Sequence, residues 1–315
     1  MAQTPEGIFG DKLDFMDQAG DRLKNRYASA ERWLLAKIIE EAIPELDVED
    51  GNIKNTNRNV TVLTSKLNAI FGQLRTGPNK DIVTGILEDM QGITEFNGRY
   101  FSIAGEVAEE TFKTAQSNVE VIMQRSLGIN PDGTIKANSF IDSISNNDAV
   151  NSQLREIATR QIQGGNTVRD FTNELSDLIK TDEDGLGILN KQYNQVISDR
   201  YAQYDRAEAK SFADALDMQA FIYSGGKVQD TRRFCCQRNG LVFTREEAQQ
   251  WSSLNWQGKN TGYVPLIDMG GYNCRHAPRW ITTRSALRRR KDLEVNDEGK
   301  LVPKDGVPKQ QLHRC

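Results

Sequence analysis

The chain has 315 residues, of which 37% are hydrophobic and 27% are charged, and its formal net charge is −4. This composition is typical of a soluble protein with enough apolar residues for one or two cores. No stretch approaches the roughly 18 consecutive apolar residues of a membrane-spanning helix, and the first residues lack the basic start and apolar run of a signal peptide. We therefore expect a protein without a membrane partner that is made and kept in a cytoplasm.

The sequence before about residue 185 predicts one helix after another. Apolar residues recur there at spacings of three or four, which places them on one face of each helix. Because each helix is apolar on one side only, we expect the helices to pack on one another in a bundle. The predicted stripes cover residues 23–38, 60–74, 82–93, 107–122, 150–157 and 168–178.

The end of this helical region is marked by an acidic loop. The last helix before the loop can be capped by Asn166 or Thr167. The loop TDEDGLG, residues 181–187, then precedes a long helix predicted from Leu189 to Ala220. We place the domain boundary in this loop.

After residue 220 the sequence changes character. A short β-rich run, an Asn-Gly turn leading into a second apolar run, a short helix and a last extended element are predicted. These elements are AFIYSGG, NGLVF, REEAQQW and YNCRHAPRWIT. The predicted fold class is therefore α+β, with a mainly helical domain at 1–184, a small α+β module at 185–291 and an extended tail at 292–315.

The cysteines leave three interpretations open. In a reducing compartment, all four cysteines, Cys315 included, are expected to be thiols or metal ligands rather than disulfides. Cys235, Cys236, Cys274 and His276 could hold a zinc ion, although adjacent residues of an extended chain point to opposite sides and could share an ion only in a kinked backbone. The second interpretation is a cysteine nucleophile with His276 as its base. In the third, one of the adjacent cysteines is simply buried and the other exposed.

Basic residues are concentrated near the end of the chain. Such a stripe can follow phosphate groups, but it can equally be a solvated helix face or a surface for an acidic partner. The stripe consists of Arg275, Arg279, Arg284, Arg288, Arg289, Arg290 and Lys291.

Several short motifs occur in a recognisable succession between about Asp199 and Thr282. They are an Arg-x-Glu element on a long helix, a short strand, an Asp-x-Arg followed by a cysteine, a Gly-x-Val-Phe strand and an Asn-Cys-Arg loop. In this chain they read DRAEAKSFADAL, AFIYSGG, DTRRFCCQRNGLVF and GGYNCRHAPRWI. This quarter of the chain resembles the phage minor head protein family, also called the Mu F-like or head morphogenesis family.

The chain departs from the family pattern at its cysteines. The family often has Cys-x-x-Cys before the glycine, where this chain has adjacent Cys235 and Cys236. It often ends in His-x-Asn-Cys-Arg-Cys, where this chain has Gly271 in place of the first histidine and His276 in place of the last cysteine. The cysteines therefore look like the remnant of a structural knuckle that joins the strands to the Asn-Cys-Arg loop, with zinc optional.

The resemblance implies a structural role rather than an enzymatic one. The expected protein is a tailed-phage virion component, located in the head near the portal vertex and in the host cytoplasm during assembly. It would assist head assembly, genome packaging or DNA delivery, with the portal, other capsid proteins and packaged DNA as partners. Two alternatives are a zinc-stabilised DNA-binding protein, with Arg284 and Arg288 to Arg290 on phosphates, and a cysteine-dependent hydrolase.

Overall fold

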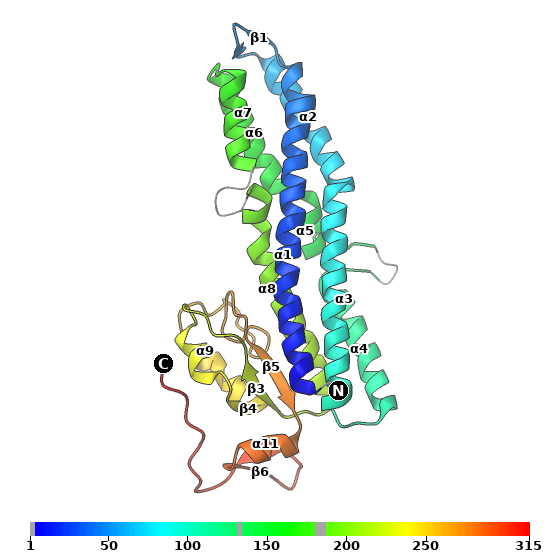
Figure 1. Ribbon diagram of the computed structural model, residues 1–315, viewed down its shortest axis with the longest axis vertical. Coiled ribbons are helices and arrows are strands. Elements are labelled where there is room, and N and C mark those ends of the chain that lie inside the picture. Colours follow the sequence, from blue (N-terminus) through cyan, green and yellow to red (C-terminus); the bar gives the residue numbers. More distant parts are fainter. Residues whose placement is uncertain (1–3, 131–133, 180–186) are drawn as a thin grey trace. The chain divides into compact units, whose positions relative to one another are not determined.

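The computed structural model in Figure 1 describes residues 4–130, 134–179 and 187–315, without the side chains of 120, 122–127 and 194–196. The chain forms two compact units that alternate along the sequence. The bundle unit contains Gln18–Asp89 and Gln124–Ile197, and the sheet unit contains Met1–Asp17, Met90–Met123 and Ser198–Cys315. The boundary predicted after residue 184, and with it most of the acidic loop, lies outside the described residues.

The bundle unit is built from helices, as the apolar stripes predict. The stripe residues Leu23, Tyr27 and Leu34 of α1 are at most 1% exposed, and so are Leu63, Leu67 and Ile70 of α2. Pro44 stands at the start of a short 3-10 turn and ends the first helical segment. The elements of this unit, some of which continue into the sheet unit, are α1 (Pro5–Lys37), a π-helical turn (Ile38–Ala42), a 3-10 turn (Ile43–Glu45), β1 (Val48–Glu49), β2 (Asn52–Ile53), α2 (Asn57–Thr76), α3 (Pro78–Ala104), α5 (Phe140–Asn146), α6 (Asp148–Gln163), α7 (Val168–Ile179) and α8 (Ile188–Ala215).

Several helices of the bundle unit are capped by side chains, α7 and α8 among them. Of the two predicted caps of α7, the structure uses Thr167, whose hydroxyl accepts a hydrogen bond of 3.0 Å from the amide of Asp170. The cap of α8 comes from a distant residue, since Glu31 of α1 accepts a bond of 2.9 Å from the amide of Asn190. Burial raises the pKa of Glu31 to about 6.

A three-stranded antiparallel sheet organises the sheet unit (Figure 1). Its strand order is β4-β3-β5, and the residues of β3 alternate between two cores. Phe221 and Tyr223 face the larger core, which includes residues of α1, α3, α4 and α8, while Ala220 and Ile222 face α11 and the β6–β7 hairpin. The elements are α4 (Glu109–Leu127), β3 (Ala220–Ser224), α9 (Arg233–Arg238), β4 (Val242–Thr244), α10 (Arg245–Gln249), a 3-10 turn (Gln250–Ser253), β5 (Ala277–Ile281), α11 (Thr283–Arg289), β6 (Leu293–Val295) and β7 (Leu301–Pro303).

The predicted mixture of helices and strands is confirmed, with local differences. Helix α8 ends at Ala215 rather than 220, because Asp217 takes a left-handed φ of 48° and the amide of Met218 bonds back to the carbonyl of Ala213. In the predicted tail, β6 and β7 pair as a hairpin with Leu293 and Leu301 buried. Among the described residues, no helix is long and apolar enough to cross a membrane.

Candidate metal centre

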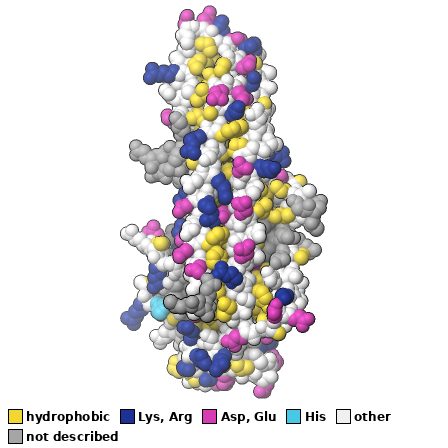
Figure 2. Space-filling view, turned by 45° about the vertical axis from the view of Figure 1, so that its right-hand side comes forward, with side chains coloured by type: hydrophobic (Ala, Val, Ile, Leu, Met, Phe, Trp, Pro, Cys, Tyr) yellow, Lys and Arg dark blue, Asp and Glu magenta, His cyan; other side chains and the backbone are white. Residues whose placement is uncertain are grey.

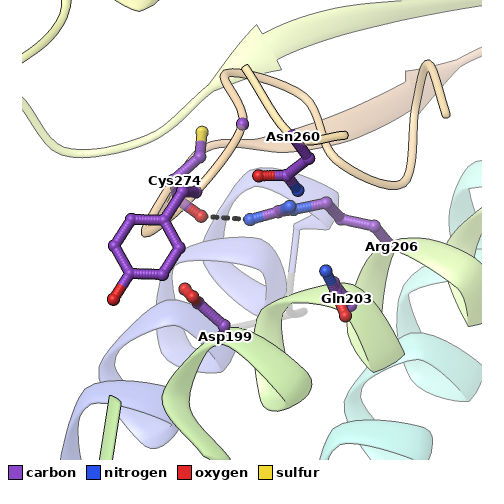
Figure 3. A pocket seen from close by; sticks show the side chains of 7 residues that line it. Asp199, Gln203, Arg206, Asn260 and Cys274 are labelled. Atoms are coloured by element: carbon purple, nitrogen blue, oxygen red, sulfur yellow. Dashed lines mark hydrogen bonds between the residues drawn. The ribbon is translucent and has the colours of Figure 1, made fainter. Parts of the chain in front are cut away.

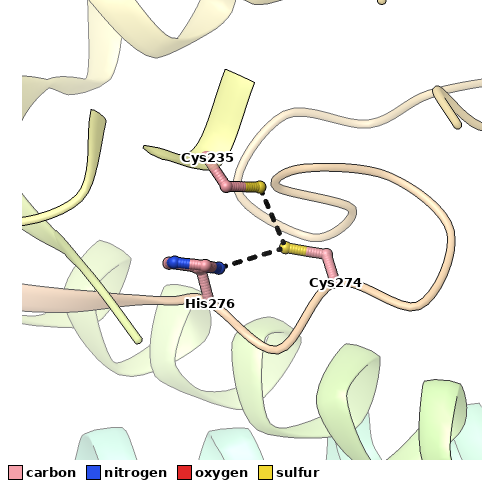
Figure 4. A group of neighbouring side chains, drawn as sticks. All are labelled: Cys235, Cys274 and His276. Carbon is pink, nitrogen blue, oxygen red and sulfur yellow. Dashed lines mark hydrogen bonds between the residues drawn. The ribbon is translucent and has the colours of Figure 1, made fainter. Parts of the chain in front are cut away.

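Three of the predicted metal ligands come together inside the sheet unit. Cys235 lies on α9, Cys274 in the loop before β5, and His276 directly before that strand (Figure 4). The Sγ atoms of Cys235 and Cys274 are 3.9 Å apart, and Nδ1 of His276 is 3.9 Å from Sγ of Cys274. All three side chains are buried, and their ligand atoms lie within 4.8 Å of one another.

The fourth predicted ligand, Cys236, lies outside this cluster. It forms a disulfide bond with Cys315, so its sulfur is not a free thiolate for a metal ion. The segment that carries Cys235 and Cys236 is helical rather than extended, and neighbouring helical residues are turned by about 100° from each other. The expectations that Cys236 is a ligand and that all four cysteines avoid disulfides are therefore corrected.

The loop that presents Cys274 is held by an arginine of α8. Nη1 of Arg206 donates to the carbonyl of Ile267 at 2.7 Å, and Nη2 donates to the carbonyl of Cys274. Gly271 has a φ of 92°, and a Cβ there would lie 2.0 Å from the carbonyl oxygen of Gly258. The loop therefore requires glycine at this turn, and Arg206 fixes the loop against the helix.

A second glycine makes room for the two sulfur atoms. A Cβ on Gly270 would lie 2.2 Å from Sγ of Cys235 and 2.9 Å from Sγ of Cys274. The amide of Gly270 also donates a hydrogen bond of 3.2 Å to Sγ of Cys274. Gly225 makes similar room for His276, because a Cβ there would lie 2.8 Å from the imidazole ring. The backbone thus surrounds the cluster without filling it.

The two thiols of the cluster differ in acidity. The pKa of Cys274 lies well below its ordinary value, chiefly because the Cys235 thiol hydrogen-bonds to it, with His276 and Arg206 acting in the same direction against burial. The same hydrogen bond, together with burial, raises the pKa of Cys235. The hydroxyl of Tyr223 donates to Sγ of Cys235 at 3.2 Å. Cys274 is therefore the more acidic thiol of the pair.

These side chains fit a zinc ion in chemistry and spacing. Zinc binds thiolate and imidazole ligands, and a tetrahedral ion with Zn–S bonds of about 2.3 Å separates two sulfur ligands by about 3.8 Å. The observed separation of the two sulfurs, 3.9 Å, matches this value. The cluster supplies three ligands from two segments of the chain, and Tyr223 places its hydroxyl beside them.

The cluster is poorly placed for attack on a substrate. Cys235 is 3% exposed and Cys274 is 4% exposed. A polar pocket lies next to the cluster, lined by Asp199, Gln203, Arg206, Asn260, Gly271, Tyr272 and Cys274. In this pocket the carbonyl oxygen of Cys274 meets the guanidinium of Arg206, while the sulfur points away from it (Figure 3).

The predicted basic stripe separates into buried and exposed residues. Arg290 is 2% exposed and forms ion pairs of 2.9 Å with Glu247 and 2.8 Å with Asp292, which corrects its assignment to a binding surface. Arg279 is largely covered and pairs with Glu6 at 2.9 Å. Exposed members are Arg275, Arg284, Arg288, Arg289 and Lys291. A group of Lys and Arg side chains is visible at the lower end of Figure 2, the end at which Figure 1 places α11.

A buried polar network beside α8 was not predicted as a site. Nζ of Lys12 lies 2.6 Å from a carboxylate oxygen of Asp205, and the amide of Asn97 donates to Asp205 at 3.1 Å and to Glu208 at 2.8 Å. All four residues are at most 3% exposed. The Arg-x-Glu element contains both Glu208 of this network and Arg206, which holds the loop of Cys274. It was therefore the one sequence signal that pointed to these two residues.

Comparison of the chain with protein-family models, with curated proteins and with solved structures gives no match.

Proposed function

We propose that the chain is a structural minor head protein of a tailed bacteriophage, located at or near the portal, that assists head assembly, genome packaging or DNA delivery. We further propose that zinc held by Cys235, Cys274 and His276 fixes the module that carries the resemblance. The supporting observation is that the Arg-x-Glu element, the segment of Cys235 and the Asn-Cys-Arg loop, which are separate in the sequence, contact one another in the folded chain. Arg206 of the Arg-x-Glu element holds the carbonyl of Cys274, while the sulfur of Cys235 lies 3.9 Å from that of Cys274.

This arrangement is what a structural knuckle requires. Bound zinc would supply a cross-link between α9 and the loop before β5 and so contribute to the stability of the folded module. Arg206 orients the loop, and Gly270 leaves space beside the two sulfurs. Burial of both cysteines supports a structural role over that of a cysteine-dependent hydrolase, which needs a reachable thiolate.

The role in the virion is tested on purified particles. Phage particles produced by cells that express the chain should contain its peptides in few copies compared with the major capsid protein. When heads and tails are separated, the peptides should remain with the heads. If the chain were abundant in the lysate and absent from purified particles, the proposed role would be wrong.

The zinc site is tested by elemental analysis of the native protein and of matched variants. We expect about one zinc per chain in the native protein and in Cys236→Ala, and loss of the metal in Cys235→Ala, Cys274→Ala and His276→Ala. Unfolding after chelation would show that the metal contributes to stability. A metal-free native protein would mean that the cluster is held by packing and hydrogen bonds alone.

A second candidate function, DNA binding, is favoured by the basic side chains of α11 and by Lys291, which follows that helix. Arg284, Arg288, Arg289 and Lys291 are exposed, and none makes an ion pair with another described residue. Four phosphate contacts would give a slope of about −3.6 in a plot of log affinity against log salt concentration. Retention on DNA that does not depend on salt, or on these four side chains, would exclude this candidate.

A further inference from the structure

The segment of residues 304–315, which we call the tail segment, is held by very few contacts. It follows β7 and returns to α9, where Cys315 is bonded to Cys236 (Figure 1). Its residues are all exposed or half-exposed, including the apolar Val307 and Leu312. The chain before it is anchored differently, because Leu301 of β7 is buried in a hydrophobic core.

Hydrogen bonds attach the tail segment mainly at Lys304 and Gln310 and much less beyond them. The amide of Lys304 donates to the carbonyl of Asp292 at 2.8 Å, and the amide of Gln310 donates to the Asp292 carboxylate at 3.2 Å. The amide of His313 donates to the carbonyl of Gln237 at 3.0 Å. The side-chain amide of Gln310 also donates to the carbonyl of Val242 at 2.9 Å, so the tail segment is attached as far as Gln310. Beyond Gln310, the bond from His313 is the one hydrogen bond found among the described residues, and no apolar side chain of the tail segment is buried. The disulfide is therefore the main restraint on its last residues.

The two cysteine pairs of the sheet unit differ in access to a reductant. Cys236 is half-exposed and Cys315 is exposed, whereas Cys235 and Cys274 are buried. Thiol–disulfide exchange requires a thiolate to reach one of the two bonded sulfurs. A reductant can therefore act on the Cys236–Cys315 bond without reaching the neighbouring cluster.

We propose that the Cys236–Cys315 disulfide is a redox-controlled latch that fixes the tail segment on α9 when oxidised and releases it when reduced. The reductant is a dithiol. One of its thiolates attacks a sulfur of the disulfide, forming a mixed disulfide and releasing one cysteine, which takes up a proton. The second thiolate of the dithiol then displaces the other cysteine, so that the reductant becomes a disulfide and the protein gains two electrons and two protons. The latch does not depend on the proposed virion role.

The effect of the latch depends on whether the surroundings of the protein are reducing or oxidising. Cytoplasmic thiols keep accessible cysteines reduced, and oxidising surroundings allow disulfides to persist. The tail segment is then free in reducing surroundings and fixed in oxidising ones. We expect the cluster of Cys235, Cys274 and His276 to be the same in both states, because all three side chains are buried.

The test compares the oxidised protein with the same protein treated with dithiothreitol. Peptide mapping without reduction should recover a cross-linked pair containing Cys236 and Cys315 in the oxidised sample only. Hydrogen exchange of the amide of His313 should be at least ten-fold faster after reduction, while exchange in β3 remains unchanged. Equal exchange in both states, or failure of oxidised glutathione to produce the cross-link, would overturn the proposal.

Matched variants separate the latch from general destabilisation. Cys315→Ser should give fast exchange in the tail segment under both conditions, with no further effect of dithiothreitol. Ser252→Ala, at an exposed position of the 3-10 turn, is the control and should keep the full response to reduction. A Cys315→Ser protein that still responded to dithiothreitol in this segment would contradict the assignment of the latch to this bond.

Discussion

Glu208 should make the stability of the protein depend on pH in a specific direction. Its carboxyl group is fully buried on α8. Burial raises its pKa to about 7, and the charge of Asp205 acts in the same direction. Hydrogen bonds with Asn97 and Thr94, and the charge of Lys12, lower the pKa without cancelling the effect of burial.

The size and sign of the effect follow from this shift. The pKa rises from 4.5 to about 7, and at about 1.4 kcal/mol per pKa unit this corresponds to about 3 kcal/mol. Between these values the folded protein keeps the proton of Glu208, while the unfolded chain loses it. The stabilisation is therefore complete below pH 4.5, decreases as the pH rises and is lost above about pH 7.

The measurement is the free energy of unfolding in urea, for the wild type and for Glu208→Gln, at intervals from pH 4.5 to 8. Glutamine stays neutral and keeps an acceptor for Asn97. Relative to the wild type, the variant should gain about 3 kcal/mol between pH 4.5 and 7 and then remain constant. The exposed Glu298→Gln is the control and should show no such change. A constant difference between Glu208→Gln and the wild type would refute the reasoning.

Four further substitutions test the other structural assignments. Gly270→Ala would push the cluster sulfurs apart, so it should lower the free energy of unfolding by about 1 to 3 kcal/mol and cause loss of bound zinc. Gly226→Ala is the control and should change both quantities little, because there is open space at its Cβ. Urea denaturation and metal analysis measure the two effects. Arg290→Met leaves two carboxylates without their buried partner and should cost about 3 to 5 kcal/mol in urea unfolding. Glu31→Gln should gain about 2 kcal/mol over the wild type between pH 4.5 and 6, since the pKa of Glu31 is raised over that range. Arg206→Lys loses the paired hydrogen bonds to the loop, so it should weaken zinc binding about ten-fold or more in a chelator titration. Unchanged zinc affinity would contradict the positioning role of Arg206.

The parts of the fold that depend on neighbouring residues were predictable from the sequence. The spacing of Leu23, Tyr27 and Leu34 predicts helix because residues three and four apart lie on the same face. Thr167 was one of two predicted caps, and the amide that donates to it belongs to Asp170, three residues further on. The strands around Ala220 and Trp280 were found because short β-rich runs are bounded by turn residues.

Features made by distant residues were not predictable in this way. Lys12 and Asp205 are 193 positions apart, so no local pattern indicates that they form a buried ion pair. Arg290 belongs to a basic run that looks exposed in the sequence, yet it is buried because it forms ion pairs with Glu247 and Asp292. The bond between Cys236 and Cys315 closes a separation of 79 residues and depends on the course of the whole module. Each of these contacts is set by tertiary packing.

The Arg-x-Glu element has a physical reason that becomes visible only in three dimensions. In a helix, Asp205 and Glu208 lie on one face, while Arg206 is turned by about 100° from the first and 200° from the second. The first face is buried in the polar network around Asn97, and the arginine reaches the carbonyl of Cys274, which is 68 positions away in the sequence. Because of this spacing, one helix contributes Asp205 and Glu208 to the buried polar network and Arg206 to the loop that carries Cys274. If Arg206 stood one position earlier or later in the sequence, its side chain would point away from the carbonyl of Cys274. This is why the element, although it contains no cysteine, carries information about the cluster.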